Sequence, residues 1–239
     1  MKDCYNDYAK NVVFSNFCEK KFLEWGQVCL QNYYLPHLPV EKNASILEIG
    51  CGCGRYLYLL KKLGFKNIEG IDISADQIQY AKNNFNLEEN VQLGDALEVL
   101  KTKTKHYDAI LILDVLEHLE FDYSICLIKE MHRALKDGGK IILQVPNALA
   151  PLAPIRYADI THLRAYTPSS INQSLRMGGF QQVCFSSLPA PIHGYKSLIR
   201  RVLWKLFINP LITFYMLVTC GDKMGGIYTP NILATATKN

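Results

Sequence analysis

Three glycines stand at alternate positions, Gly50, Gly52 and Gly54. They follow a short apolar run that carries an acid, Glu48, near its end. The run predicts a buried strand, and the residues after the glycines predict the start of a helix. Glycines at such a junction allow backbone angles that a side chain would forbid, and they let a ligand lie directly on the main chain. Dinucleotide-binding loops favour the spacing G-x-G-x-x-G, whereas here Arg55 stands at the last glycine position. A carboxylate before the turn would repel a pyrophosphate, but it suits a ligand with an ammonium group.

Two further predicted strands also end in acidic residues. The strand at 67–72 ends in Asp72, which lies 22 residues after Gly50. An acid at this offset can accept hydrogen bonds from ribose hydroxyls, or it can cap the helix predicted from Ser74. Ile73 follows it and can pack on an adenine face. The third strand, predicted at 91–96, ends in Gly94-Asp95-Ala96, which is also compatible with an ordinary turn.

A continuous apolar run from Tyr107 to Asp114 is typical of a strand that is buried on both faces. It leads directly into Val115-Leu116-Glu117-His118-Leu119. Further on, Leu135–Lys140 predicts a helix stop and a turn before a strand at 141–145. Strands and helices therefore alternate from 45 to 145, which predicts a parallel sheet with helices on both faces.

These motifs, in this order, resemble those of the class I S-adenosylmethionine (SAM)-dependent methyltransferases, whose first motif is E/D-x-G-x-G-x-G. The DVLEHL run from Asp114 resembles the group that includes ubiquinone-pathway, natural-product and glycan O-methyltransferases. The resemblance covers roughly residues 45–145. It implies S-adenosyl-L-methionine as cofactor and S-adenosyl-L-homocysteine as product, with the adenine amino group held by Asp95. The residues that it assigns to the cofactor are Glu48, Gly50, Cys51, Gly52, Gly54, Asp72, Ile73, Gly94, Asp95, Ala96, Asp114 and Val115.

The resemblance also implies one doubly wound α/β domain over residues 1–239. Its mostly parallel, seven-stranded, Rossmann-like sheet would have an antiparallel last strand, with residues 45–145 as the SAM-binding core. Strands six and seven are predicted at 180–187 and 231–237. The expected helices after the first strand lie at 56–63, 75–85, 123–135 and 168–177.

An amphipathic helix is predicted before the sheet, at 16–34. Its apolar stripe would consist of Cys18, Phe22, Trp25, Cys29 and Tyr33. Two interpretations remain open: residues 1–40 form a helical lid over the cofactor, or the helix simply packs on the sheet.

A polar segment after the fifth strand supplies candidate residues for the acceptor side. The run from Asp159 to Thr167, D-x-T-H-x-R-x-Y-T, resembles a segment of methyltransferases from glycan and natural-product clusters. An oxygen nucleophile with a high pKa needs a base, and the candidates are His118, His162 and Asp159. Each histidine can instead be structural. Arg164 and Tyr166 are predicted to contact the acceptor, or else to lie on a solvated loop face.

About forty residues, 188–230, separate predicted strands six and seven, and a structureless loop of that length is rare in a compact domain. The sequence therefore predicts an added helical subdomain there, which forms an acceptor-side cap together with 146–170. Its apolar core, 198–218, has three interpretations: a cap or homodimer contact, an interfacial membrane helix with a basic edge, or core filling. Asn209-Pro210 is expected to interrupt this core, and the apolar run after Pro210 is too short to span a bilayer.

Composition and charge narrow the choice of partners. The net charge of +4 does not demand nucleic acid, and the D/N-P-P-Y/F motif of nucleic-acid amino methylation is absent after strand four. The eight cysteines form no C-x-x-C pair, and no apolar leader opens the chain. We therefore expect a reduced, cytoplasmic protein without a metal site, with peripheral contact to the inner membrane face left open.

The predicted function is O-methylation of a small polar acceptor, such as a sugar, a sugar nucleotide or an intermediate of surface-glycan (polysaccharide) biosynthesis. The apolar insertion keeps a quinone-like or lipid acceptor as the alternative. A SAM-binding protein without turnover is the alternative from another functional class.

Overall fold

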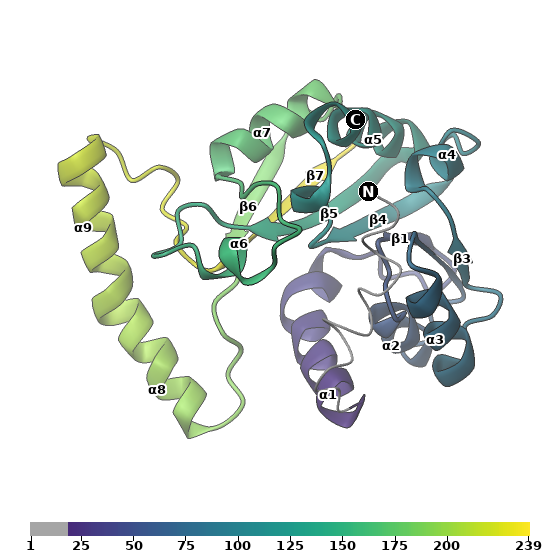
Figure 1. Cartoon of the computed structure of the whole chain (residues 1–239), viewed down its shortest axis with the longest axis horizontal. Helices are drawn as coiled ribbons and strands as arrows, with labels where there is room; N and C mark the ends of the chain where they lie inside the picture. Colours follow the sequence, from purple (N-terminus) through teal and green to yellow (C-terminus); the bar gives the residue numbers. More distant parts are fainter. Residues whose placement is uncertain (1–18) are drawn as a thin grey trace.

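The computed structural model describes residues 19–239. Seven strands form one sheet in the order β3-β2-β1-β4-β5-β7-β6 (Figure 1). β1 to β5 pair in parallel, whereas β7 is antiparallel to both of its neighbours, β5 and β6. The predicted fold class, including the antiparallel last strand, is confirmed. The strands are β1 (Ser45–Ile49), β2 (Asn67–Asp72), β3 (Val91–Leu93), β4 (Tyr107–Leu113), β5 (Leu135–Pro146), β6 (Val183–Ser187) and β7 (Asn231–Thr237).

Helices cover both faces of this sheet (Figure 1). Successive residues of a strand point to opposite faces, so Ile110 and Ile112 of β4 pack in one core while Leu111 and Leu113 pack in the other. Both faces of a parallel sheet are apolar and need cover. One face carries α4 (Ala96–Leu100), α5 (Phe121–Ala134) and α7 (Pro168–Met177), and the other carries α1 (Glu19–Cys29), α2 (Arg55–Lys62) and α3 (Ala75–Phe85).

The predicted N-terminal helix is present, and its predicted apolar stripe is partly buried: Cys29 is buried, and Phe22 and Tyr33 are half-buried. Residues 16–18 lie outside the described residues, and α1 continues into a π-helix, η3 (Leu30–Tyr34), and a 3-10 turn, η4 (Leu35–His37). Trp25 of the predicted stripe is 45% exposed, whereas Gly26 is buried. A Cβ at Gly26 would lie 2.4 Å from Cδ of Arg55. Close approach to α2, rather than apolar periodicity alone, therefore decides which side of α1 faces inward.

Three strands differ from their predicted bounds: β3, β5, and β6, which begins at Val183 instead of residue 180. β3 stops at Leu93 because Asp95 caps α4, its Oδ1 accepting a hydrogen bond from Leu97 N at 2.9 Å. β5 begins at Leu135, so the residues predicted to form a turn before the strand are part of it. The pairing of β5 with β4 shifts register there. Pro154 begins a short helix, α6 (Pro154–Ala158), since proline is favoured in the first helical turn.

The insertion between β6 and β7 forms one continuous helix of 26 residues, Tyr195–Cys220. It comprises α8 (Tyr195–Leu203), a π-helix, η6 (Trp204–Ile208), and α9 (Asn209–Cys220). The prediction that Asn209-Pro210 interrupts it is wrong. Proline has no N–H to donate to the carbonyl oxygen four residues before it. The π-helix just upstream has a different pattern of main-chain hydrogen bonds, so the helix continues through Pro210.

The unbroken helix corrects two further expectations. It is long and apolar enough to cross a membrane by length and composition, unlike the run after Pro210 alone. Its most apolar stretch is not buried inside the protein, so core filling is wrong as well. In Figure 1 α8 and α9 stand apart from the layered body, on the left.

Candidate active site

Ligands of open α/β sheets bind where the strand order reverses, at the carboxyl ends of the strands. Here that point lies between β1, which the glycine loop follows, and β4, which Asp114 follows. Asp114 lines two cavities there. The first cavity is lined by Ile49, Gly50, Gly52, Ile71, Asp72, Ile73, Gln77, Gly94, Ala96, Asp114, Val115, His118, Leu119, Tyr123 and Leu127.

The glycine loop forms the floor of the first cavity. Gly50 and Gly52 have φ angles of 68° and 52°, in the region that favours glycine. A Cβ at Gly50 would lie only 2.3 Å from Cγ2 of Val115. The Gly52 N–H donates to Asp72 Oδ2 at 2.8 Å, which ties the loop to the end of β2. The main chain is therefore bare and fixed where a ligand would rest on it.

Glu48 lies at the end of β1 with its side chain buried, at 3% exposure. Its Oε2 has no hydrogen-bond partner among the described residues. Desolvation raises the pKa of this carboxyl to about 8, although the Arg55 guanidinium opposes the rise. A buried carboxyl is costly unless it is paired. Glu48 therefore favours a cationic ligand group.

His118 ends a 3-10 turn, η5 (Leu116–His118), and lines the first cavity. Oγ1 of Thr161 lies 2.9 Å from Nδ1 of His118 and donates to Oδ1 of Asp159 at 2.6 Å. The hydroxyl has one proton, so it accepts from Nδ1, and Nε2 becomes the basic nitrogen of the ring. Desolvation, then His162, lowers the pKa of His118 from its ordinary 6.5, which keeps the ring neutral at pH 7.

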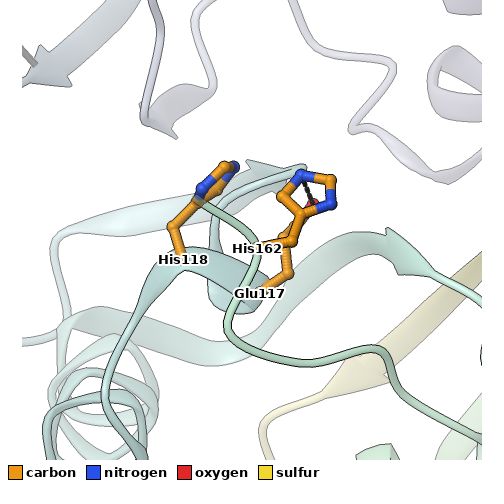
Figure 2. Close-up of side chains that lie close together, drawn as sticks. All are labelled: Glu117, His118 and His162. Carbon is orange, nitrogen blue, oxygen red and sulfur yellow. Dashed lines mark ion pairs between the residues drawn. The ribbon is translucent and has the colours of Figure 1, made fainter. Parts of the chain in front are cut away.

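His162 has a different environment, as Figure 2 shows. It is buried and lines neither cavity; its Nδ1 lies 3.0 Å from Ile155 O, and its Nε2 lies 4.0 Å from Glu117 Oε1. The Glu117 carboxyl is fully buried. Desolvation is the main reason why its pKa lies well above the usual range. The two histidines therefore differ in position: His118 lines the first cavity, whereas His162 lines neither cavity.

The same group raises the question of a metal. Ligand atoms of Glu117, His118 and His162 all lie within 4.8 Å of one another, so the three residues could hold a metal ion. Both Glu117 carboxyl oxygens are without a hydrogen-bond partner among residues 19–239. The expectation of no metal stays a prediction, and sequence spacing gave no signal for this cluster because His162 is distant in the chain.

The second cavity, of about 480 Å³, lies beside the end of β5. A chain of hydrogen bonds forms one wall: Tyr34 OH donates to Gln144 Oε1, and Gln144 Nε2 donates to Asp114 Oδ2, both at 2.7 Å. Asp114 opens into both cavities, yet removal from bulk water raises its pKa to about 6. The other lining residues are Trp25, Cys29, Tyr33, Arg55, Tyr56, Leu188, Pro189, Ala190, Pro191, Arg200, Arg201, Trp204, Thr229, Pro230 and Asn231.

Comparison with known proteins identifies the family to which this fold belongs. A family model described as a methyltransferase domain matches residues 30–184, which is more than half of the chain. The chain belongs to this methyltransferase family. The methyltransferase is also 26% identical to a SAM-dependent methyltransferase from Archaeoglobus fulgidus, and the two structures agree with a TM-score of 0.67 over 92% of this chain and 97% of that one.

Curated relatives match a smaller part. A tRNA U34 carboxymethyltransferase from Nautilia profundicola is 30% identical over 148 residues, which cover 59% of this chain and 48% of the relative. A mitochondrial ubiquinone biosynthesis O-methyltransferase from Dictyostelium discoideum is 27% identical over 46% of this chain and 37% of the relative. The matches therefore span about half or less of these relatives. A Haemonchus contortus phosphoethanolamine N-methyltransferase, crystallised with S-adenosyl-L-methionine, shares the fold alone, at 16% identity and a TM-score of 0.58 over 98% of this chain and 60% of that one.

The cofactor of the methyltransferase is S-adenosyl-L-methionine, and the first cavity fits it. Glu48 does not line this cavity, but its Oε2, which has no hydrogen-bond partner among residues 19–239, suits the ammonium group of the methionine part. The Asp72 carboxylate, held at the cavity by Gly52 N, suits the ribose hydroxyls. Gly50 and Gly52 present main chain without side chains at this cavity, so a ligand can lie close to it.

The predicted cofactor residues fall into two groups. Cys51 packs beside β2, Gly54 begins α2, Asp95 caps α4 and accepts a hydrogen bond from Tyr123 OH at 2.6 Å, and Glu48 is buried. These four do not line the first cavity, and a direct contact with the cofactor stays a prediction for them. The predicted residues that line it are Gly50, Gly52, Asp72, Ile73, Gly94, Ala96, Asp114 and Val115.

The two predicted acceptor contacts are not in the cavities. Tyr166 is 5% exposed, packs in the core and donates its hydroxyl to Leu116 O at 3.2 Å, so its side chain has a structural role instead. Arg164 is half-buried beside the Phe121 ring and lines neither cavity. The segment runs alongside the end of β5, where residue 147 bridges to residue 166.

Several lining residues were not predicted. Gln77 and Tyr123 lie in helices with no motif, so only the tertiary structure reveals them. Tyr34 lies in the π-helix, and its contact with Gln144 spans 110 positions. Gln144 did carry a signal, since it is a polar residue inside an otherwise apolar buried strand.

Proposed function

We propose that this methyltransferase transfers a methyl group to a hydroxyl oxygen of a small polar acceptor held in the second cavity. One observation carries the proposal: His118 lines the first cavity as a neutral base, oriented through Thr161 by Asp159. A base is needed for a hydroxyl with a high pKa and is dispensable for a neutral amine.

The chain's own residues would then divide the work. S-adenosyl-L-methionine supplies an activated methyl group on a sulfonium. Nε2 of His118 accepts the hydroxyl proton as the oxygen attacks, and Asp159 stabilises the imidazolium through Thr161. Asp114, open to both cavities, marks where acceptor and donor meet. Alignment of the two reactants supplies the remainder of the rate enhancement.

The lining of the second cavity supports an acceptor that is both polar and anionic. Three arginines, Arg55, Arg200 and Arg201, line this cavity. Arginine is well suited to bind phosphate through paired N–H groups. Aromatic side chains such as Tyr34 and Trp204 offer faces on which a sugar ring can pack. We therefore place a phosphorylated sugar or a sugar nucleotide first among acceptors.

A quinone-like or lipid acceptor is the second candidate. It is favoured by the exposed apolar helix Tyr195–Cys220, whose Trp204 also lines the second cavity. It is favoured as well by the similarity to a relative named as a ubiquinone biosynthesis O-methyltransferase. Other relatives are named as tRNA U34 carboxymethyltransferases, so tRNA belongs in the same test.

The test is transfer of isotopically labelled methyl from S-adenosyl-L-methionine to three acceptor pools: sugar nucleotides, polyprenyl hydroquinones and bulk tRNA. Label in the sugar-nucleotide pool is the expected result. Label in the hydroquinones alone would favour the second candidate, and label in tRNA alone would overturn both.

Two variants distinguish catalysis from cofactor binding without turnover. His118→Gln should lose turnover while cofactor affinity, measured by calorimetry, stays within about twofold, because only the base is removed. His132→Gln is the matched control, since His132 packs against Phe180 away from both cavities. Cofactor binding with no transfer to any pool or extract would favour the non-catalytic alternative.

A further inference from the structure

The long helix of the insertion, Tyr195–Cys220, presents an unusual surface. A soluble protein normally buries the apolar stripe of a helix, yet here the apolar side chains point to solvent. Phe207 and Phe214 are 62% and 66% exposed, and Leu211 and Val218 are 65% and 68% exposed. Contiguous exposed apolar surface of this kind marks an interaction site.

The charge pattern of the helix indicates what covers this surface. The basic residues Lys196, Arg200, Arg201 and Lys205 follow one another at helical spacing on one side of the first half. No acidic residue occurs between 195 and 220. Arg200 and Arg201 face the second cavity, so the opposite, apolar side of α8 points away from the body. A basic edge beside an apolar face matches the anionic headgroups and acyl chains of a bilayer.

Helix length and the return path decide between spanning and lying in the membrane. A helix of 26 residues is about 39 Å long, enough to span. Its two ends, however, return to β6 and β7, which pair with each other. On the return side Ile227 and Thr229 are tied to the body, since their carbonyls accept hydrogen bonds from Asn147 Nδ2.

Only residues 221–226 are therefore available to return the chain from α9 to the body. Six residues reach about 20 Å when fully extended, whereas a hydrocarbon core is about 30 Å thick. An extended segment would also leave its main-chain groups without partners in lipid. The helix can therefore lie in the interface but cannot cross the bilayer while the domain stays folded.

We propose that helix Tyr195–Cys220 docks the methyltransferase onto an anionic phospholipid membrane, lying parallel to its surface. The apolar side of α8 and most of α9 enter the acyl boundary, while Lys196 and Lys205 contact headgroups. The mouth of the second cavity then lies at the membrane surface. Docking does not depend on the proposed base or acceptor, so its test is a binding measurement.

The experiment is flotation of the full chain with vesicles of phosphatidylcholine alone or of equimolar phosphatidylcholine and phosphatidylglycerol. We expect flotation with the anionic vesicles and release by high salt. Lys196→Gln with Lys205→Gln should weaken binding about 30-fold, because each lysine near an anionic surface contributes about one factor of five. Lys66→Gln with Lys129→Gln, on other exposed surfaces, should change it less than twofold.

A second pair of variants tests the apolar face. Phe207→Ser with Phe214→Ser should abolish flotation while circular dichroism and cofactor affinity stay normal, because neither side chain packs in the core. Val40→Ser with Leu152→Ser removes apolar groups that are even more exposed, elsewhere on the protein, and should have no effect.

Three outcomes would overturn the proposal. The first is no flotation with either kind of vesicle. The second is a dimer in sedimentation analysis that the two serine substitutions dissociate, since a second copy would then cover the helix. The third is retention of the protein in membranes through alkaline carbonate extraction, which indicates a spanning helix.

Discussion

Substitution of Gly50 by alanine tests how the first cavity is built. Gly50 has φ of 68°, and the new Cβ would lie 2.3 Å from Cγ2 of Val115. The left-handed backbone costs an ordinary residue about 1–2 kcal/mol. Normal contact begins near 3.4 Å, so the Val115 side chain must retreat by about 1 Å. Overpacking of this kind costs a further ~1–3 kcal/mol. We therefore expect Gly50→Ala to lower the free energy of unfolding by roughly 2–5 kcal/mol.

A matched variant separates the two contributions. Gly138 has φ of 78°, but a Cβ there would meet nothing within 4 Å. Gly138→Ala should therefore cost only the backbone term, about 1–2 kcal/mol. Adding Val115→Ala to Gly50→Ala removes the clashing methyl group, so the double variant should be more stable than the sum of the two single effects predicts.

Urea unfolding followed by circular dichroism, without cofactor, measures all four variants. Titration with S-adenosyl-L-methionine should show weaker binding for Gly50→Ala than for Gly138→Ala, because only the former displaces Val115, which lines the first cavity. Equal unfolding midpoints for the two glycine variants, or strict additivity with Val115→Ala, would refute the packing argument.

Three further predictions concern titratable groups. His118→Gln should lower kcat by about 10²-fold or more. In the unsubstituted enzyme kcat/KM should fall as pH drops through a value below the ordinary 6.5, because the lowered pKa of His118 keeps this base neutral down to that point. A fall in kcat/KM that begins above pH 7, or one that persists in His118→Gln, would contradict the assignment. Asp72→Asn should weaken cofactor binding about tenfold with little loss of stability, since the amide oxygen can still accept from Gly52 N; calorimetry showing unchanged affinity would remove Asp72 from the ribose site. For Glu48 the folded pKa of about 8 exceeds the ordinary 4.5, so the folded state binds more protons between these values and the cofactor-free protein loses stability as pH rises through that window. Glu48→Gln should therefore stabilise the cofactor-free protein at pH 8, by up to about 4 kcal/mol, and flatten its stability between pH 4.5 and 8; a parallel pH dependence in thermal melts of both proteins would be inconsistent with this.

The core of the sheet was predictable because its signals are local. β2, α3 and β7 begin and end at the predicted residues, as does α7 between its Thr167 cap and Gly178. Strand periodicity, caps and glycine turns act over a few positions, so the sequence displays them directly. The insertion helix was mispredicted at Pro210 because a π-helix accommodates that proline, and this depends on main-chain bonding that residue types do not reveal.

By itself the sequence determined the order of strands and helices, the glycine loop after β1, and the acids at the carboxyl ends of β1, β2 and β4, because each rests on neighbouring residues. The tertiary structure decided which side chains meet. It brought Asp159 to His118 through Thr161, Gln144 between Tyr34 and Asp114, and His162 beside Glu117. In the tertiary structure Tyr166 is also buried in the core, and the helix of the insertion is exposed. Such contacts join positions far apart in the chain, and they are set by packing across the whole sheet, which no local pattern encodes.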